Sequence, residues 1–265
     1  MINEHIISLL VIIVLTTTTW LVSLYKKDVS IVDSMWSIMI LSACLVYIDI
    51  DVPIDLKSQL IVFLVTVWAL RLSVHLTIRN WGEPEDQRYV QIRNKYRPHF
   101  AIKSLFIIFI FQALLAWVVS LPLNAALGIT TFRWIDTAAL LLWATGMFFE
   151  SVADYQLTRF KRDPANKGKV MSSGLWRYSR HPNYFGEFLI WWGYYLFAVN
   201  SDTWWTVISP LLMTWLLLKF SGVTLMESDI STRRPDYKNY TKETNAFFPG
   251  PRKSTDHNDA TKENL

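Results

Sequence analysis

Seven apolar stretches, several of them about twenty residues long, set the strongest limit on what this chain can fold into. A run of that length crosses a bilayer as one α-helix, because inside lipid the backbone must satisfy its own hydrogen bonds. We therefore expect an all-α, polytopic membrane protein. A single membrane domain is expected over residues 1–253, and the polar tail over residues 254–265 is expected to be disordered. The predicted spans are Ile6–Tyr25, Met35–Ile50, Ser58–Ile78, Ser104–Ala126, Trp134–Leu157, Tyr184–Val199 and Trp204–Leu225. The second and the sixth of these spans are short.

The distribution of positive charge predicts the orientation of these spans. Of the 26 Lys and Arg residues, only Lys57 and Arg133 fall in the loops on one side, while the segments on the other side carry nearly all the rest. Cytoplasmic loops hold the excess of Lys and Arg, which predicts an N-terminus outside and a C-terminus in the cytoplasm. The polar segments 79–103 and 159–181 then share the cytoplasmic face with the C-terminal tail. We expect a multi-pass protein of the bacterial inner membrane, or of the endoplasmic reticulum in a eukaryote.

Several classes of protein are excluded by what the sequence lacks. The net charge of +4 is spread between apolar runs and forms no aromatic, basic groove, so no nucleic acid partner is expected. The single cysteine, Cys44, permits no disulfide framework, and the five histidines lack metal-ligand spacing, so we predict no metal site. No Gly-x-Gly-x-x-Gly, P-loop, His-Glu-x-x-His or Gly-x-Ser-x-Gly motif is present. Any cofactor must therefore be held by the membrane domain itself.

The segment Ser172–Gly193 concentrates the polar features of the chain. It begins as a basic loop with Gly and Ser and continues directly into an apolar run, with Pro182 suited to the first turn of a helix. The N–H groups of that turn lie beside Arg177, Arg180 and His181. A helix N-terminus with cations beside it predicts an anion site at a membrane edge. The basic loop that precedes it favours a bound phosphate group, although such loops also hold anionic lipid headgroups.

Ionisable groups inside the predicted spans mark a second candidate region. Asn183 and Glu187 lie four residues apart on one helix face, and a Glu one turn inside a membrane helix is expected to face a polar cavity. On the fifth span, Glu150 and Asp154 are also four apart, with Lys161 seven residues further on nearly the same face. These three are either functional groups or a ladder of ion pairs with the neighbouring arginines.

The third span carries a further set of polar groups. Arg71, His75 and Arg79 recur every four residues and share one helix face. Snorkelling to the membrane surface explains Arg79, but Arg71 lies two turns deeper, so Arg71 and His75 are expected to line a polar cavity. The alternative for this pair is structural packing. The loop 82–89 that follows mixes both signs of charge, which favours an internal salt-bridge network over catalysis.

Two acidic positions at the ends of spans complete the candidates. Asp33 lies at the start of the second span, with Trp36 one turn later. The acid either caps the helix or faces the shared cavity as a hydrogen-bonding group for the substrate. Glu227 follows the seventh span, and the aromatic residues of the tail predict that the tail folds back onto the cytoplasmic face. That fold-back either closes a cofactor pocket or provides interfacial anchoring.

The stretch Leu175–Glu187 resembles the signature of the steroid 5α-reductase / isoprenylcysteine methyltransferase superfamily. Over Asp28–Arg252 the chain resembles the DUF1295 branch of that superfamily. The reductase members imply a seven-helix membrane fold with NADPH held between the helices and the cytoplasmic loops. Further matches to the branch are Arg71-Leu72, His75, Arg79-Asn80-Trp81-Gly82, Glu85-Asp86, Arg88-Tyr89 and Ala246-Phe247-Phe248-Pro249.

The resemblance also implies roles for particular residues. Asp154, Asn183 and Glu187 resemble cofactor-contacting residues of the reductases, and Lys161 stands where the family has an arginine, which alone has a bidentate fork for phosphate. The family's second-span Glu has Asp33 as its nearest counterpart here. The methyltransferases share Arg180-His181-Pro182, Tyr184 and an acid after the last span that resembles Glu227. Glu187 directly after Gly186 fits the reductases better.

The sequence therefore predicts an integral-membrane, NADPH-dependent reductase of a C=C bond conjugated to a carbonyl in a steroid-like or isoprenoid lipid. The alternatives are an S-adenosylmethionine-dependent lipid methyltransferase and a non-catalytic membrane binding protein. The expected partners are the lipid-like substrate and the membrane, with no obligate protein partner. The predicted cofactor contacts are Asp154, Lys161, Arg177, Arg180, His181, Asn183 and Glu187. The predicted catalytic residues are Asp33, His75, Tyr184 and Glu227, and the predicted substrate contacts are Arg71 and Trp36.

Overall fold

The computed structural model describes residues 3–48, 53–220 and 236–253, and in these residues it contains helices and no strands. The tail over residues 254–265 and Glu227 lie outside the described residues. The main helices are α1 (Glu4–Lys26), α2 (Ile31–Val46), α3 (Leu56–Asn80), α4 (Gln87–Lys95), α5 (Phe100–Ser104), α6 (Phe111–Leu127), α7 (Trp134–Arg162), α8 (Pro182–Ala198), α9 (Ile208–Trp215) and α11 (Tyr237–Glu243). Short 3-10 or π-helical segments are η1 (Leu105–Ile110), η2 (Pro164–Asn166), η3 (Gly174–Arg177), η4 (Trp204–Val207) and η5 (Leu216–Phe220).

The all-helical prediction is confirmed for the described residues, and each of the seven predicted spans overlaps a helix there. Four helical stretches are long and apolar enough to cross a membrane, namely Glu4–Lys26, Leu56–Asn80, Phe100–Leu127 and Trp134–Arg162. Ile31–Val46 and Trp204–Lys219 are shorter apolar helices. Helix α2, which corresponds to the second predicted span, begins at Ile31 instead of Met35, which places Asp33 in its first turn. The prediction placed the start of the span at the beginning of the continuous apolar run, and so it left out this first turn, which contains the charged Asp33.

By its internal contacts the chain divides into two compact units. Unit 1 comprises Met1–Thr137 and Tyr194–Ser209, and unit 2 comprises Ala138–Gly193 and Pro210–Leu265. The expectation of a single domain over residues 1–253 stays a prediction.

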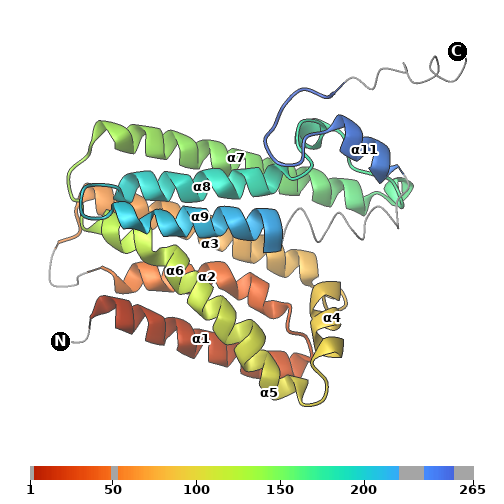
Figure 1. Ribbon diagram of the computed structural model, residues 1–265, viewed down its shortest axis with the longest axis horizontal. Helices are drawn as coiled ribbons and strands as arrows, with labels where there is room; N and C mark the ends of the chain where they lie inside the picture. Colours follow the sequence, from red (N-terminus) through yellow and green to blue (C-terminus); the bar gives the residue numbers. More distant parts are fainter. Residues whose placement is uncertain (1–2, 49–52, 221–235, 254–265) are drawn as a thin grey trace, which may run out of the picture. The chain divides into compact units, whose positions relative to one another are not determined.

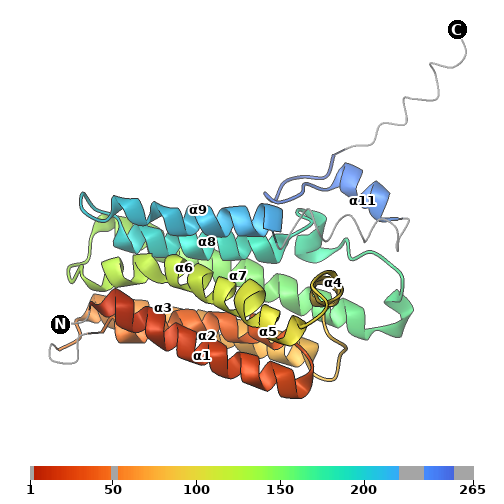
Figure 2. The same cartoon turned by 60° about the horizontal axis from the view of Figure 1, so that its bottom comes forward.

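Unit 1 is built around a bundle of α1, α2, α3 and α6, which lie side by side in Figures 1 and 2. The buried face of α1 is formed mainly by small hydroxyl residues, including Ser8 and Thr16. Ser8 Oγ lies 3.1 Å from the hydroxyl of Tyr47, and Thr16 Oγ1 lies 3.3 Å from the sulfur of Met39, both from across the helix contact. Small residues let membrane helices approach closely, and hydroxyl hydrogen bonds then join them.

A buried cluster of charges closes one end of unit 1. The ammonium of Lys57, whose side chain is completely buried, lies 2.9 Å from Asp136 Oδ2, and the Arg133 guanidinium lies 2.9 Å from Asp136 Oδ1. Arg133 also donates hydrogen bonds to the carbonyls of Phe197 and Val199, which satisfies carbonyls at the end of α8. The two basic residues predicted outside the cytoplasmic face therefore share one carboxylate. We call Lys57, Arg133 and Asp136 the charge clamp.

Exposed aromatic residues mark both ends of unit 1. Trp134 and Trp204 are exposed near the charge clamp, at the end where α3 begins. At the end where α3 finishes, Trp81 and Tyr25 are exposed, and the ammonium of Lys26 lies 5.8 Å from the Trp81 ring centroid. Trp and Tyr concentrate at the two membrane–water interfaces of membrane proteins. The pattern is that of a bundle whose apolar middle lies in lipid.

In unit 2, glycines bring α7 and α8 into backbone contact. A Cβ atom on Gly186 of α8 would lie 2.5 Å from Glu150 N and 2.5 Å from Gly146 O, both backbone atoms of α7. Further along α8, a Cβ on Gly193 would lie 2.9 Å from Ala139 O. Any larger residue would push the helices apart, so the spacing of α7 and α8 is set by these glycines. This close approach positions the buried acids described below.

Gly186→Ala is expected to lower the free energy of unfolding by about 1–3 kcal/mol, because backbone atoms must move to accept the added methyl. Thermal unfolding in detergent measures this loss. Gly128→Ala is a matched control, since its Cβ would lie in ordinary contact, 3.5 Å from Ala125 O. Equal melting temperatures for the two variants would show that α7 and α8 are not held at backbone contact.

Candidate functional site

Unit 1 contains a cluster that joins the start of α2, the loop before α4, α4 and α6. The Tyr89 hydroxyl donates a 2.5 Å hydrogen bond to Asp33 Oδ1, and Gln112 Nε2 donates to the Tyr89 oxygen at 3.0 Å. Arg88 Nη2 lies 2.9 Å from Asp33 Oδ2 and also binds Asp86. We call these five residues the Asp33–Tyr89 cluster. Its members come from four separate segments, which fixes the orientation of the Tyr89 hydroxyl.

The charge states within this cluster follow from burial and neighbours. Burial, and next the charge of Asp33, raises the pKa of the Tyr89 phenol well above its usual value, so Tyr89 stays protonated. Burial would raise the pKa of Asp86, but hydrogen bonds from Arg88 hold that pKa below its usual value. Burial opposes the charge of Arg88, yet Asp86 and Asp33 raise its pKa. At neutral pH Tyr89 is therefore a neutral hydroxyl whose one proton is donated to Asp33, beside charged, paired groups.

The loop before α4 forms the internal salt-bridge network that its mixed charges predicted. Arg93 binds both oxygens of Glu85, at 2.6 and 3.0 Å, and Glu85 Oε1 also accepts the N–H of Val29. Asp33 is not the cap of α2, because Ser30 occupies that position and the Asp33 carboxylate binds Arg88 and Tyr89. The alternative for Asp33, a hydrogen-bonding role toward the substrate, stays a prediction.

Unit 2 contains a second cluster on the facing sides of α7 and α8. Asn183 Nδ2 donates a 3.0 Å hydrogen bond to Asp154 Oδ1, and Trp191 Nε1 donates to Glu187 Oε1 at 2.9 Å. Asp154 is 7% exposed, Glu187 is 6% exposed and Glu150 is 4% exposed. Asn183, Glu187 and Trp191 recur every four residues along one face of α8. This Asp154–Glu187 cluster concentrates buried oxygen acceptors where α7 and α8 are closest.

The basic loop before α8 is folded by hydrogen bonds to its neighbours. The Trp176 indole donates to Ala153 O at 3.0 Å, and Leu175 N–H donates to Gln156 Oε1 at 3.0 Å, which fastens η3 to α7. Helix α8 begins at Pro182, as predicted. Two N–H groups near its start are already used, because His181 N–H donates to Ser179 Oγ and Tyr184 N–H to Asn183 Oδ1. The anion site predicted at this helix start would therefore depend mainly on the cations beside it.

A C-terminal strap, residues 236–253, packs against this loop. The Tyr240 hydroxyl donates to Trp176 O at 2.5 Å, and Ser179 Oγ donates to Phe247 O at 2.7 Å. The guanidinium of Arg180 donates to the carbonyls of Thr241 and Thr244, at 2.7 and 3.2 Å. The predicted fold-back of the tail is confirmed to the extent that the strap packs on the basic loop before α8. Arg180 thus helps to hold the strap, while its predicted contact with a phosphate stays a prediction.

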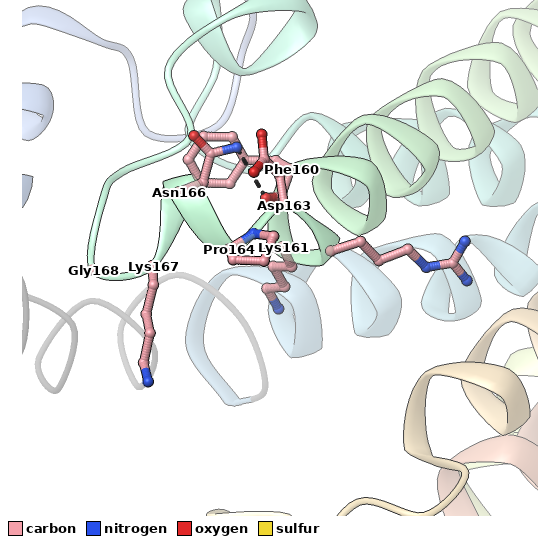
Figure 3. A pocket seen from close by; sticks show the side chains of 8 residues that line it. Phe160, Lys161, Asp163, Pro164, Asn166, Lys167 and Gly168 are labelled. Atoms are coloured by element: carbon pink, nitrogen blue, oxygen red, sulfur yellow. Dashed lines mark hydrogen bonds between the residues drawn. The ribbon is translucent and has the colours of Figure 1, made fainter.

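The remaining predicted residues lie in several places. The rings of His181 and Tyr184 stack at the start of α8, with their centroids 5.6 Å apart. Arg177 is exposed in η3, and exposed Lys161 lines a shallow hollow at the end of α7 (Figure 3). Arg71, His75 and Trp36 are half-buried on α3 and α2. Among the described residues, no group of three or more His, Cys, Asp or Glu side chains has a metal-binding arrangement.

Several residues of these clusters were not identified as site residues from the sequence. Gln112 carries a carboxamide inside the apolar run Ser104–Ala126. A polar side chain in a membrane helix requires a hydrogen-bonding partner, so Gln112 could have been identified as a site residue from the sequence. Trp191 continues the four-residue spacing of Asn183 and Glu187, another available signal. Tyr89 was noted only as part of a resemblance. Its contact with Asp33 spans 56 residues of sequence and left no periodic signal.

Comparison with known proteins gives three results. The model of a family described as "Protein of unknown function (DUF1295)" matches residues 19–244. An uncharacterized protein of Schizosaccharomyces pombe, C594.04c, is 29% identical, and the match covers 93% of this chain and 80% of that protein. No solved structure matches.

Proposed function

Because the chain belongs to the DUF1295 family, within the steroid 5α-reductase-like superfamily, we propose that it is an integral-membrane, NADPH-dependent reductase. Its substrate would be a steroid-like or isoprenoid lipid with a C=C bond conjugated to a carbonyl. Family membership by itself supports a membrane protein of the reductase/methyltransferase-like superfamily. The proposal includes all seven predicted spans, with the N-terminus outside and the C-terminus in the cytoplasm. The exposed aromatic residues at both ends of unit 1 support a membrane-crossing bundle.

The observation that carries the cofactor assignment is the Asp154–Glu187 cluster. Buried carboxylates in membrane helices are costly and are kept where they have a function. Asp154, Asn183 and Glu187 offer the acceptors that ribose hydroxyls and a carboxamide require, while exposed Arg177 and Lys161 offer positive charge for phosphates. The donor set therefore fits NADPH, which would supply hydride when bound. The protein would supply orientation and electrostatics.

The Asp33–Tyr89 cluster supports a role in polarising the substrate carbonyl. Reduction of a conjugated C=C bond builds negative charge on the carbonyl oxygen, which a fixed hydroxyl donor stabilises. The Tyr89 hydroxyl donates its one proton to Asp33, and its oxygen accepts a hydrogen bond from Gln112. In this proposal the O–H turns from Asp33 to the carbonyl oxygen when the substrate binds. We assign the carbonyl hydrogen bond to Tyr89, with Asp33 and Gln112 positioning it. His75, Tyr184 and Glu227 remain proposed contributors, as do Arg71 and Trp36 for substrate contact.

Cofactor choice tests this proposal without a known substrate. A ligand that binds only the folded protein raises its melting temperature, so NADPH, NADH and S-adenosylmethionine can be compared in parallel on the purified protein. We expect a rise with NADPH. Glu187→Ala is expected to weaken NADPH binding about tenfold or more, because it removes a hydrogen-bond acceptor for the cofactor. Asp202→Asn, which changes an exposed carboxylate, is the matched control.

Other outcomes separate the competing functions. A rise with S-adenosylmethionine alone would contradict the reductase and indicate a methyltransferase. No rise with any of the three ligands would favour a non-catalytic binding protein. Unchanged NADPH affinity in Glu187→Ala would show that the cofactor assignment to this cluster is wrong.

A further inference from the structure

The C-terminal strap is fastened to α7 next to the Asp154–Glu187 cluster. The Tyr240 hydroxyl donates a 2.5 Å hydrogen bond to the carbonyl of Trp176, and the Trp176 indole donates to Ala153 O at 3.0 Å. Tyr240 and Trp176 are both buried, so losing either hydrogen bond would be costly. Ala153 immediately precedes Asp154 on α7. This chain of contacts therefore ends one residue from a member of the cluster.

The strap also packs on the first two turns of α8. The ring of Phe247, which is 5% exposed, meets the rings of Phe185 and Phe188 edge to face, with the centroids 6.1 and 5.7 Å apart. Aromatic pairs in this arrangement stabilise a structure beyond the burial of their area. The strap therefore packs against the same two turns of α8 that carry Asn183 and Glu187.

Arg180 joins the strap to the start of α8. Its backbone N–H donates to Asn245 O at 2.9 Å, and its Nη1 donates to Thr241 O at 2.7 Å and to Thr244 O at 3.2 Å. Thr241 lies in the last turn of α11, and Thr244 is the C-cap of that helix. The last carbonyls of a helix have no partner within the helix and carry partial negative charge, which a cation stabilises. Arg180 therefore caps α11 from a position two residues before α8 begins.

In this respect Arg180 differs from the exposed cations of unit 2. Arg177 and Lys161, which are proposed for the cofactor phosphates, are exposed. Arg180 is half-buried, and its Nη1 contacts two strap carbonyls. If the guanidinium turned to a phosphate, the end of α11 would lose a charged cap, and the carbonyl of buried Thr244 would lose this donor. The observed contacts therefore favour a role of Arg180 in holding the strap.

We propose that Arg180 is a positioning residue for the cofactor site, and that it acts through the strap instead of through a contact with phosphate. Arg180 and Phe247 hold the strap against η3 and the first two turns of α8, and so they fix the orientation of Asn183 and Glu187 toward NADPH. This role rests on the proposed function, since NADPH is the ligand that it serves. A released strap then weakens NADPH binding even when every charged residue is kept.

Phe247→Ser tests this role because it changes no charge. The affinity is measured in detergent, on the purified full-length protein, from the dependence of the melting temperature on NADPH concentration. Phe247→Ser removes a buried ring of the strap and should weaken NADPH binding about tenfold or more. Phe248→Ser makes the same change at the neighbouring ring, which is 62% exposed, and should change the affinity by less than about threefold.

A double variant shows whether Arg180 acts through the strap. Arg180→Gln removes charged hydrogen bonds to the strap and should weaken NADPH binding about tenfold. Combined with Phe247→Ser, it should cause a loss close to the larger of the two single losses, because Arg180 has nothing to hold once the strap is released. Two residues that act independently would instead multiply their effects.

Proteolysis reports on the strap without NADPH. Lys238 and Lys242 are exposed on α11, and mass spectrometry identifies trypsin cleavage at these two positions. Cleavage there follows the population of released strap, so Arg180→Gln and Phe247→Ser should each speed it about tenfold. If Phe247→Ser does not fold, Tyr240→Phe removes only a hydroxyl from the strap and should change both the cleavage rate and the NADPH affinity about threefold.

Three outcomes would overturn this role and leave the proposed function intact. Losses that multiply in the double variant, or weaker NADPH binding in Arg180→Gln with unchanged strap cleavage, would show that Arg180 contacts the cofactor directly. Faster strap cleavage with unchanged NADPH affinity would show that the strap is only an anchor. If NADPH does not bind the wild type, the reductase assignment fails, and the role of Arg180 toward that cofactor fails with it.

Discussion

Asp136→Asn is expected to lower the free energy of unfolding by about 3–5 kcal/mol, because it removes the counter-charge of a buried cation. The Lys57 side chain is completely buried, and its ammonium lies 2.9 Å from Asp136 Oδ2. Its other hydrogen-bond partner, Thr131 O, lies 3.5 Å away and carries no charge. Arg133 would lose the same carboxylate. In thermal unfolding, the loss should lower the melting temperature by on the order of 10 °C.

A double variant separates the ion pair from local packing. Replacing Lys57 with Met in the Asp136→Asn background removes the unpaired charge and should recover part of the lost stability, as apolar replacements of buried ion pairs do. Asp202→Asn makes the same chemical change at an exposed site and should change stability by less than about 0.5 kcal/mol. If the double variant were no more stable than Asp136→Asn, the charge clamp would not be the source of the effect.

Features that depend on residues close together in the chain were predicted correctly from the sequence. Pro182 predicted the start of α8, and the mixed charges of the loop before α4 predicted a salt-bridge network. Asn183 and Glu187 share a helix face because a four-residue spacing requires it. The scarcity of positive charge outside the predicted cytoplasmic segments singled out Lys57 and Arg133.

Long-range pairing is what the sequence did not reveal. Nothing in the spacing shows that Lys57 and Arg133 both bind Asp136, or that Asn183 binds Asp154, since these contacts depend on how helices pack. The Gly186 contact with α7 explains why Asn183 reaches Asp154, but a glycine in a membrane helix does not name its partner.

Tyr89→Phe is expected to lower kcat by about 100- to 1,000-fold on an enone lipid that the protein reduces, because it removes a hydrogen-bond donor to the developing oxyanion. The change deletes one oxygen and keeps the ring, which is 6% exposed. The NADPH-induced rise in melting temperature should be unchanged, since the cofactor is assigned to Asp154, Asn183 and Glu187. Tyr96→Phe removes a hydroxyl from an exposed tyrosine just after α4 and is the matched control.

Two further variants distinguish a direct role of Tyr89 from a structural one. Gln112→Leu removes only the donor that orients the Tyr89 hydroxyl, so kcat should fall less than in Tyr89→Phe. Asp33→Asn keeps an oxygen acceptor for Tyr89 but weakens the pair with Arg88, so it should lower both stability and kcat. If Tyr89→Phe kept kcat within threefold of the wild type while losing stability, the hydroxyl would only fasten α4 to α2. The carbonyl donor would then have to be sought among His75, Tyr184 and Glu227.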